Sequence, residues 1–246
     1  MCFKCDRLAF GSQPSLTRRH MMAFAGAAAL AAAAPGRSFA EDVKAPPKPE
    51  NAISADAALD RLMKGNARYI DGVTKRHDFK NEREALAGGQ NPFAGILGCA
   101  DSRVAPELAF DTSRGDLFVC RVAGNIANPD VIASFEYAIA ILHTPLFMVL
   151  GHASCGAVDA AIKSIKDGTT LPGHLPSLVE GLAPAVKAVL DRPGNTLDNA
   201  IKQNVALTVE KLKSATPIIS QAVADKKIRI VGATYNLASG RVELLS

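Results

Sequence analysis

Two short segments contain the residues of this chain whose types and spacing could do chemistry. The first is CADSR at 99–103, and the second is HASC at 152–155, which begins 53 residues after Cys99. Together they offer two thiols and an imidazole. Zinc prefers sulfur and nitrogen ligands, and its catalytic sites use three protein ligands and leave a fourth position to water. Cys99, His152 and Cys155 therefore predict a zinc site with one open position.

The elements that must position these ligands follow from the hydrophobic pattern. Short apolar runs with the length and composition of buried strands alternate with stretches of helical character, which predicts an α/β fold with a mainly parallel sheet flanked by helices. A turn near 238–240 indicates a further antiparallel strand at the sheet edge. The predicted strands are 93–97, 117–122, 146–150 and 228–233, with 241–245 as the edge strand.

The order of these strands decides whether the ligands meet. Cys99 follows the first strand and His152 follows the third. In open parallel sheets, ligands bind beyond the carboxyl ends of strands. A strand order of 2-1-3-4 makes the ends of the first and third strands neighbours, so this order would bring Cys99 and His152 together.

Composition indicates one sizeable globular domain. The chain has 246 residues, of which 48% are hydrophobic and 21% are charged. The formal net charge is +4, and residues 1–40 account for all of it because they hold five basic residues and one acidic residue. The remainder is neutral, so we expect no nucleic-acid partner.

The first forty residues have the pattern of a targeting signal. A basic stretch ending in Arg18 and Arg19 precedes an apolar run at 21–34 and a small-residue pattern ending at Ala40. The twin arginines resemble a Tat signal and favour export to the periplasm or secretion, while Sec or organellar targeting stays open. The run is shorter than the roughly 20 residues of a membrane helix, so we expect no stable membrane anchor after cleavage. The predicted organisation is a Tat-like signal peptide at 1–40, a linker at 41–53 and a catalytic domain at 54–246.

The motifs at 99–103 and 152–155, with GDLFVCRVAGNI at 115–126 and EYA at 136–138, resemble the β-class carbonic anhydrases. The resemblance covers residues 54–246 and rests on a pair of motifs far more specific than an isolated Cys-x-x-Cys. It implies the β-carbonic anhydrase fold and one zinc ion per subunit. It also implies reversible hydration of CO2 to bicarbonate and a proton by zinc-bound hydroxide.

Asp101 and Arg103 receive roles from the same chemistry. A carboxylate at Asp101 can accept a hydrogen bond and orient the hydroxide toward CO2, while Arg103 can hold that carboxylate through a planar fork. In the family this pair can break, and Asp101 would then become the fourth metal ligand and close the site.

Resemblance to the plant-type branch implies a substrate pocket with three further residues. Gln90 would offer an amide contact, and Phe118 and Tyr137 would line the pocket. In that branch Gln90 comes from one subunit and the aromatic pair from the other. The resemblance therefore implies a homodimer or a higher homo-oligomer.

Two other functions fit the same motifs. The first is a hydrolase of CS2 or COS on the same fold, since zinc hydroxide can attack these small linear molecules. The second is a non-catalytic binding module stabilised by zinc or built on thiol redox chemistry. Intact Asp101 and Arg103 disfavour the second function.

Overall fold

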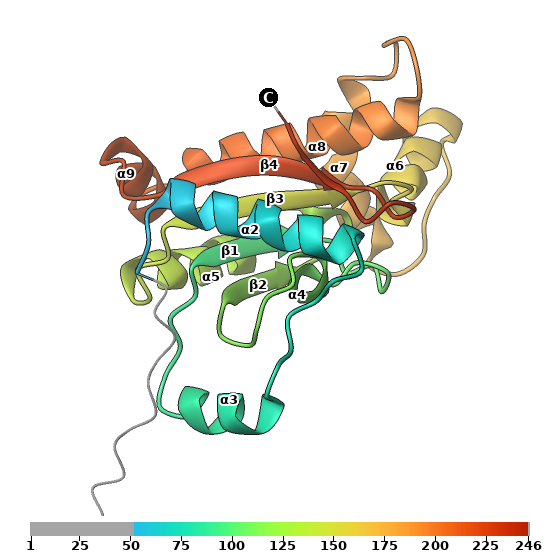
Figure 1. Ribbon diagram of the computed structural model, residues 1–246. Helices are drawn as coiled ribbons and strands as arrows, with labels where there is room; N and C mark the ends of the chain where they lie inside the picture. Colours follow the sequence, from blue (N-terminus) through green and yellow to red (C-terminus); the bar gives the residue numbers. More distant parts are fainter. Residues whose placement is uncertain (1–51, 246) are drawn as a thin grey trace, which may run out of the picture. The chain divides into compact units, whose positions relative to one another are not determined.

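The computed structural model describes residues 52–245. The predicted signal peptide at 1–40 and all but the last two residues of the predicted linker at 41–53 lie outside these described residues. The described residues build one five-stranded sheet flanked by helices (Figure 1). Its strands are β1 (Ala94–Gly98), β2 (Leu117–Arg121), β3 (Leu146–His152), β4 (Arg229–Tyr235) and β5 (Val242–Leu244).

The sheet has the order β2-β1-β3-β4-β5. Strands β1 to β4 pair in parallel, and β5 pairs antiparallel with β4. The expected α/β class, the order 2-1-3-4 and the antiparallel edge strand are all confirmed. As a result, the carboxyl ends of β1 and β3 are neighbours.

Helices cover both faces of the sheet (Figure 1). Helix α2 lies on one face, and α5, α8 and α9 lie on the other, where their apolar side chains join one buried cluster. The helices are α2 (Ala55–Ile70), α3 (Phe79–Leu86), α4 (Pro106–Ala109), α5 (Pro129–Ala140), α6 (Gly156–Asp167), α7 (Leu175–Lys187), α8 (Thr196–Lys213) and α9 (Ile218–Ala224), with a short 3-10 helix η1 (Ala123–Asn125). No helix among residues 52–245 has the length and apolar character needed to cross a membrane.

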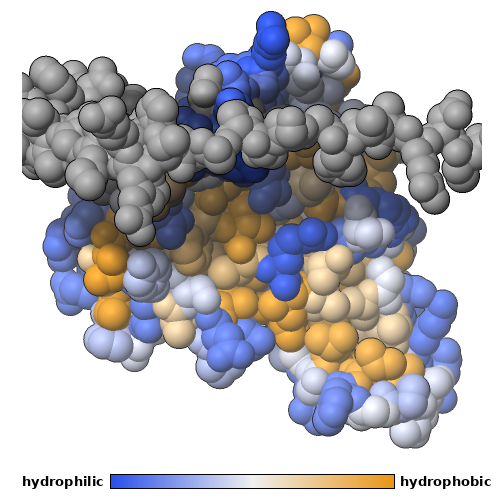
Figure 2. All heavy atoms as spheres, turned by 90° about the horizontal axis from the view of Figure 1, so that it is seen from below, coloured by the Kyte–Doolittle hydropathy of each residue, from blue (hydrophilic) through white to orange (hydrophobic). Residues whose placement is uncertain are grey.

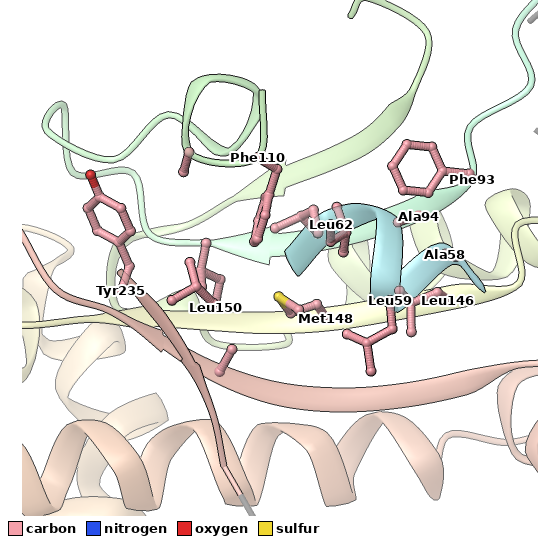
Figure 3. Close-up of a cluster of buried hydrophobic side chains, with 14 of the residues drawn as sticks. Ala58, Leu59, Leu62, Phe93, Ala94, Phe110, Leu146, Met148, Leu150 and Tyr235 are labelled. Carbon is pink, nitrogen blue, oxygen red and sulfur yellow. The ribbon is translucent and has the colours of Figure 1, made fainter. Parts of the chain in front are cut away.

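Helix α2 seals the first face of the sheet. Its N-terminus is capped by Ser54, whose side chain accepts a hydrogen bond from the backbone N–H of Ala57 at 3.2 Å. Its buried Leu62 lies over β3, where Met148 and Leu150 are also fully buried (Figure 3). This layer closes the sheet face that does not carry α8.

Helix α8 packs closely on the second face because two strand residues, Gly151 and Gly232, lack side chains. A Cβ atom added at Gly151 would lie 2.6 Å from the side chain of Val205, and one added at Gly232 would lie 2.8 Å from it. Real Cβ atoms do not make such contacts, so only glycine permits this approach. The helix is thereby seated directly on β3 and β4.

Strand β2 differs from the expectation of a strand buried on both faces. Residues 117–120 are only partly buried and Arg121 is exposed, whereas every residue of β1 and β3 is buried. The reason is position, since β2 forms one edge of the sheet. The half-buried apolar residues of β2 thus form a free sheet edge in the described chain.

The pair of Arg68 and Asp111 joins α2 to the loop after α4 and gives a test of the fold. Asp111 is nearly fully buried, and Arg68 Nε donates to its carboxylate at 2.5 Å. Burial raises the pKa of Asp111, but hydrogen bonds from Arg68 and from the Lys75 backbone outweigh burial and leave that pKa below its ordinary value. Arg68→Ala would leave this charge buried without its main partner.

We expect Arg68→Ala to lower the free energy of unfolding by about 3 kcal/mol at neutral pH, measured by urea denaturation. Because the folded pKa is lowered, this stabilisation is present above the ordinary carboxyl pKa and is lost as the pH falls through the folded value. The difference from the unmodified protein is therefore expected to shrink in acid. Lys64→Ala, which removes an exposed ion pair with Asp60 on the same helix, is expected to change stability by less than about 1 kcal/mol. Equal losses of unfolding free energy in the two variants would show that the buried pair of Arg68 and Asp111 contributes no more than an exposed ion pair.

Candidate metal centre

The carboxyl ends of β1 and β3 place the three predicted ligands. Cys99 directly follows β1, His152 is the last residue of β3, and Cys155 precedes the first residue of α6. The turn between His152 and Cys155 contains Ser154 with a positive φ of 55°. This turn reverses the chain tightly enough to return Cys155 toward the strand ends.

The structure brings the three donor groups together. The Sγ atoms of Cys99 and Cys155 lie 4.0 Å apart, and these atoms and a ring nitrogen of His152 all lie within 4.8 Å of one another. All three residues are buried. Within residues 52–245 they form the one group of His, Cys and acidic residues with the spacing to hold a metal ion.

His152 is held with one nitrogen ready to bind. Its Nδ1 lies 2.9 Å from the carbonyl oxygen of Ala153, which can only accept, so Nδ1 carries the proton. The Ala153 backbone is itself fixed by donation to the Tyr235 carbonyl at 2.9 Å. The remaining nitrogen, Nε2, is buried and has no hydrogen-bond partner. An orphaned buried acceptor next to two sulfur atoms is what a histidine ligand requires.

The two thiols differ in their tendency to ionise. The hydrogen bond from Cys155 outweighs burial and, with further donors, lowers the pKa of Cys99 to about 4. The same hydrogen bond, together with burial, raises the pKa of Cys155 well above its ordinary value. The pair therefore favours ionisation of one sulfur, and a nearby positive charge would favour ionisation of the second.

The donor set fits a zinc ion. With zinc–sulfur bonds of about 2.3 Å, two sulfurs on a tetrahedral ion lie roughly 3.8 Å apart, close to the observed 4.0 Å. A dication would supply the charge that Cys155 needs in order to ionise, and the free Nε2 of His152 would complete three ligands.

Asp101 and Arg103 form a two-bonded fork beside these ligands. Arg103 donates from Nε to Oδ1 at 2.9 Å and from Nη2 to Oδ2 at 2.7 Å, and its backbone N–H also donates to Oδ1 at 2.9 Å. These bonds hold the pKa of Asp101 well below its usual range. Asp101 Oδ2 lies 3.8 Å from His152 Nε2. The carboxylate therefore stays ionised near the ligands while its oxygens bind Arg103.

Two further residues contact this centre, and the sequence alone assigned no chemistry to either. Arg121, at the end of β2, donates from Nε to the carbonyl of Cys99 at 2.9 Å and from Nη2 to the carbonyl of Asp101 at 2.6 Å. Gly124 donates its backbone N–H to Cys99 Sγ at 3.3 Å and has a φ of 73°. Both residues lie in the family motif at 115–126, but an arginine or a glycine in a sequence does not by itself indicate a hydrogen bond to a metal ligand.

The predicted pocket residues lie elsewhere in the chain. Phe118 and Tyr137 lie near one another, with ring centroids 6.4 Å apart, and Tyr137 is half exposed. Phe118 pairs with Gly95, four residues before Cys99, so it is displaced along the sheet from the ligands. Gln90 is exposed and precedes β1, whereas Cys99 follows it. Within a single chain, these three residues therefore do not lie together with the proposed zinc ligands.

Comparison with known proteins identifies close relatives. The sequence profile described as carbonic anhydrase matches residues 94–242. The chain is 42% identical over 189 residues to carbonic anhydrase 2 of Mycobacterium tuberculosis, which covers 76% of this chain and 91% of the relative. It is also 42% identical over 195 residues to a carbonic anhydrase of Mycolicibacterium smegmatis, covering 77% and 93% of the two chains.

Solved structures agree with the sequence relatives. The β-carbonic anhydrase CcaA has a TM-score of 0.59 at 26% identity and covers 76% of this chain and 95% of its own. A structure described among two tetrameric β-carbonic anhydrases of Sordaria macrospora has a TM-score of 0.59 at 25% identity, with coverage of 78% and 95%. With the profile match spanning more than half of the chain, these likenesses establish that the chain belongs to the β-carbonic anhydrase family.

Proposed function

We infer that the protein catalyses the reversible hydration of CO2 to bicarbonate and a proton, with one zinc ion per subunit held by Cys99, His152 and Cys155. The observation that carries this inference is the convergence of two sulfurs and an unpartnered imidazole nitrogen beside an ionised carboxylate. The names of the sequence relatives support it, since they are carbonic anhydrases over most of both chains.

A zinc ion held by these three residues would lower the pKa of a bound water from about 15.7 to near neutral. The remaining work belongs to this chain. Asp101 accepts a hydrogen bond from the attacking water and fixes its orientation, because Arg103 keeps the carboxylate ionised and turned in one direction. Arg121 fixes the backbone on either side of this carboxylate.

Metal analysis combined with a CO2 hydration assay tests the function. The purified mature protein is expected to contain about one zinc per chain, to hydrate CO2, and to lose activity on chelation and regain it with zinc. Turnover of CS2 and COS is measured in parallel, and rapid sulfide release without CO2 hydration would contradict the proposal. A metal-loaded protein inactive on all three molecules would instead favour a non-catalytic module.

We further propose a plant-type substrate pocket shared between two subunits of a homodimer or larger homo-oligomer. Residues 117–120 of edge strand β2 are half buried, and Tyr137 and Ile141 of the adjoining α5 segment are exposed. Figure 2 shows hydrophobic residues gathered on the side of the molecule where β2 forms the lower edge of the sheet in Figure 1. Pairing across this side would let Gln90 of one subunit meet Phe118 and Tyr137 of the other. Analytical ultracentrifugation measures the oligomeric state. A protein that sediments as a monomer and still has full CO2 hydration activity would contradict this assembly.

Export through the Tat-like signal at 1–40 is also proposed, with release of a periplasmic or secreted enzyme after Ala40 and without a membrane anchor. The twin arginines at Arg18 and Arg19 and the short apolar run support it. Folding before export would protect thiolate ligands from an oxidising compartment. Arg18→Lys with Arg19→Lys is expected to leave unprocessed precursor in the cytoplasm, and unchanged fractionation would refute this route.

A further inference from the structure

A buried side chain on α8 reaches the backbone that supports the Cys99 sulfur. Asn204 is 3% exposed, and its Nδ2 donates to the carbonyl oxygen of Gly124 at 2.8 Å. Gly124 in turn donates its own N–H to Cys99 Sγ at 3.3 Å. Gly124 therefore accepts a hydrogen bond from the Asn204 amide at its carbonyl and donates one to the Cys99 sulfur from its N–H.

The backbone conformation of Gly124 explains what the hydrogen bond from Asn204 does. Its φ of 73° and ψ of 13° lie in the left-handed region, which glycine adopts without a steric penalty. A turn bond from the Asn125 N–H to the Val122 carbonyl at 2.8 Å spans Gly124, and Asn204 adds a contact from outside this turn. A donor to a buried thiolate works only when its N–H points at the sulfur, and glycine supplies no side chain to hold that direction. The turn bond holds part of this direction, and the bond from Asn204 anchors the turn to α8.

We propose that Asn204 is a positioning residue that fixes Gly124 so that its N–H stabilises the Cys99 thiolate and tunes its donation to the metal ion. This inference rests on the proposed zinc site and adds an outer hydrogen-bond partner to it. Outer partners of metal ligands are worth about 10-fold to 100-fold in metal affinity or activity.

The decisive variant is Asn204→Leu, which keeps the branched outline of the side chain and removes its donor. With a weaker hydrogen bond the sulfur donates more electron density once it binds a metal, and with the Gly124 backbone no longer anchored the sulfur is held less well in the ligand geometry. Cobalt(II) is the probe, because thiolate-to-cobalt charge transfer absorbs in the near ultraviolet. We expect this band to move to longer wavelength and the cobalt affinity, measured by chelator competition at neutral pH, to fall by about 10-fold.

Asn66→Leu is the matched control. Asn66 is equally buried, and its amide binds the carbonyls of Ala109 and Gly240 at 2.9 and 2.8 Å on the face covered by α2. Its loss is expected to lower the unfolding free energy without moving the cobalt band or the cobalt affinity. Asn204→Ala, which adds no bulk to the core, serves as a second donor-free variant if the leucine variant does not fold.

The outcomes separate the two claims. A charge-transfer band in the unmodified protein that stays in place in a folded Asn204 variant, with unchanged affinity, overturns the role of Asn204 alone. Absence of any thiolate band in the cobalt-loaded unmodified protein overturns the metal centre itself and this inference with it.

Discussion

Cys155→Ser is expected to abolish both zinc binding and CO2 hydration. Cys155 supplies one of two sulfur donors, and its thiol lies 4.0 Å from the Cys99 sulfur in a buried site. Serine keeps the size but offers a hydroxyl that does not ionise at neutral pH, so the site loses a charge as well as a soft ligand. Outer-shell substitutions alone cost about 10-fold to 100-fold in metal affinity, and removal of a ligand is expected to exceed that range.

The chain offers a matched control for this variant. Cys120 in β2 is partly buried, and its sulfur lies outside the donor group formed by Cys99, His152 and Cys155. Cys120→Ser is expected to retain about one zinc per chain and near-normal turnover, both measured on the same preparation. Retention of zinc and activity by Cys155→Ser would remove the basis of the proposed centre.

Asp101→Ala is expected to separate metal binding from catalysis. The three proposed ligands stay in place, so the zinc content is expected to remain near one per chain. Without the ionised carboxylate held by Arg103, the attacking water loses its acceptor and its fixed orientation. Losses of this kind reduce turnover by about 100-fold to 10,000-fold.

Stopped-flow CO2 hydration and metal analysis on one preparation measure both quantities. Asp116→Ala is a suitable comparison, because it also removes a carboxylate bonded to an arginine, Arg61, at 2.9 Å. That variant is expected to lose stability while its folded fraction keeps normal turnover. Unchanged hydration by Asp101→Ala would show that this carboxylate does not orient the reaction.

Much of the framework could be predicted from the sequence because its signals are local. The first and third strand runs end at ligand residues, and the alternation of strands and helices predicts a parallel sheet. The expected order 2-1-3-4, which makes Cys99 and His152 neighbours, is confirmed by the pairing of β1 with β3. No long-range information beyond this order was needed to place the donor set.

The remaining features depend on tertiary contacts that no local pattern encodes. Arg121 looks like the polar end of a strand, and its bonds to Cys99 and Asp101 exist only because β2 pairs with β1. Asn204 lies on a helix with many polar residues, so its reach to Gly124 across the fold has no sequence signature. The half-buried state of β2 likewise reflects its place at the sheet edge rather than its composition.

The seat of α8 on the sheet has a mechanical consequence for the metal centre. Gly151, against which Val205 packs, is the residue immediately before the ligand His152. A methyl group at Gly151 would have to displace either the helix or the strand end, and the second response would shift the imidazole. Substitutions at Gly151 that disturb the packing of α8 are thus expected also to lower the metal content, although no side chain at this position contacts the ion.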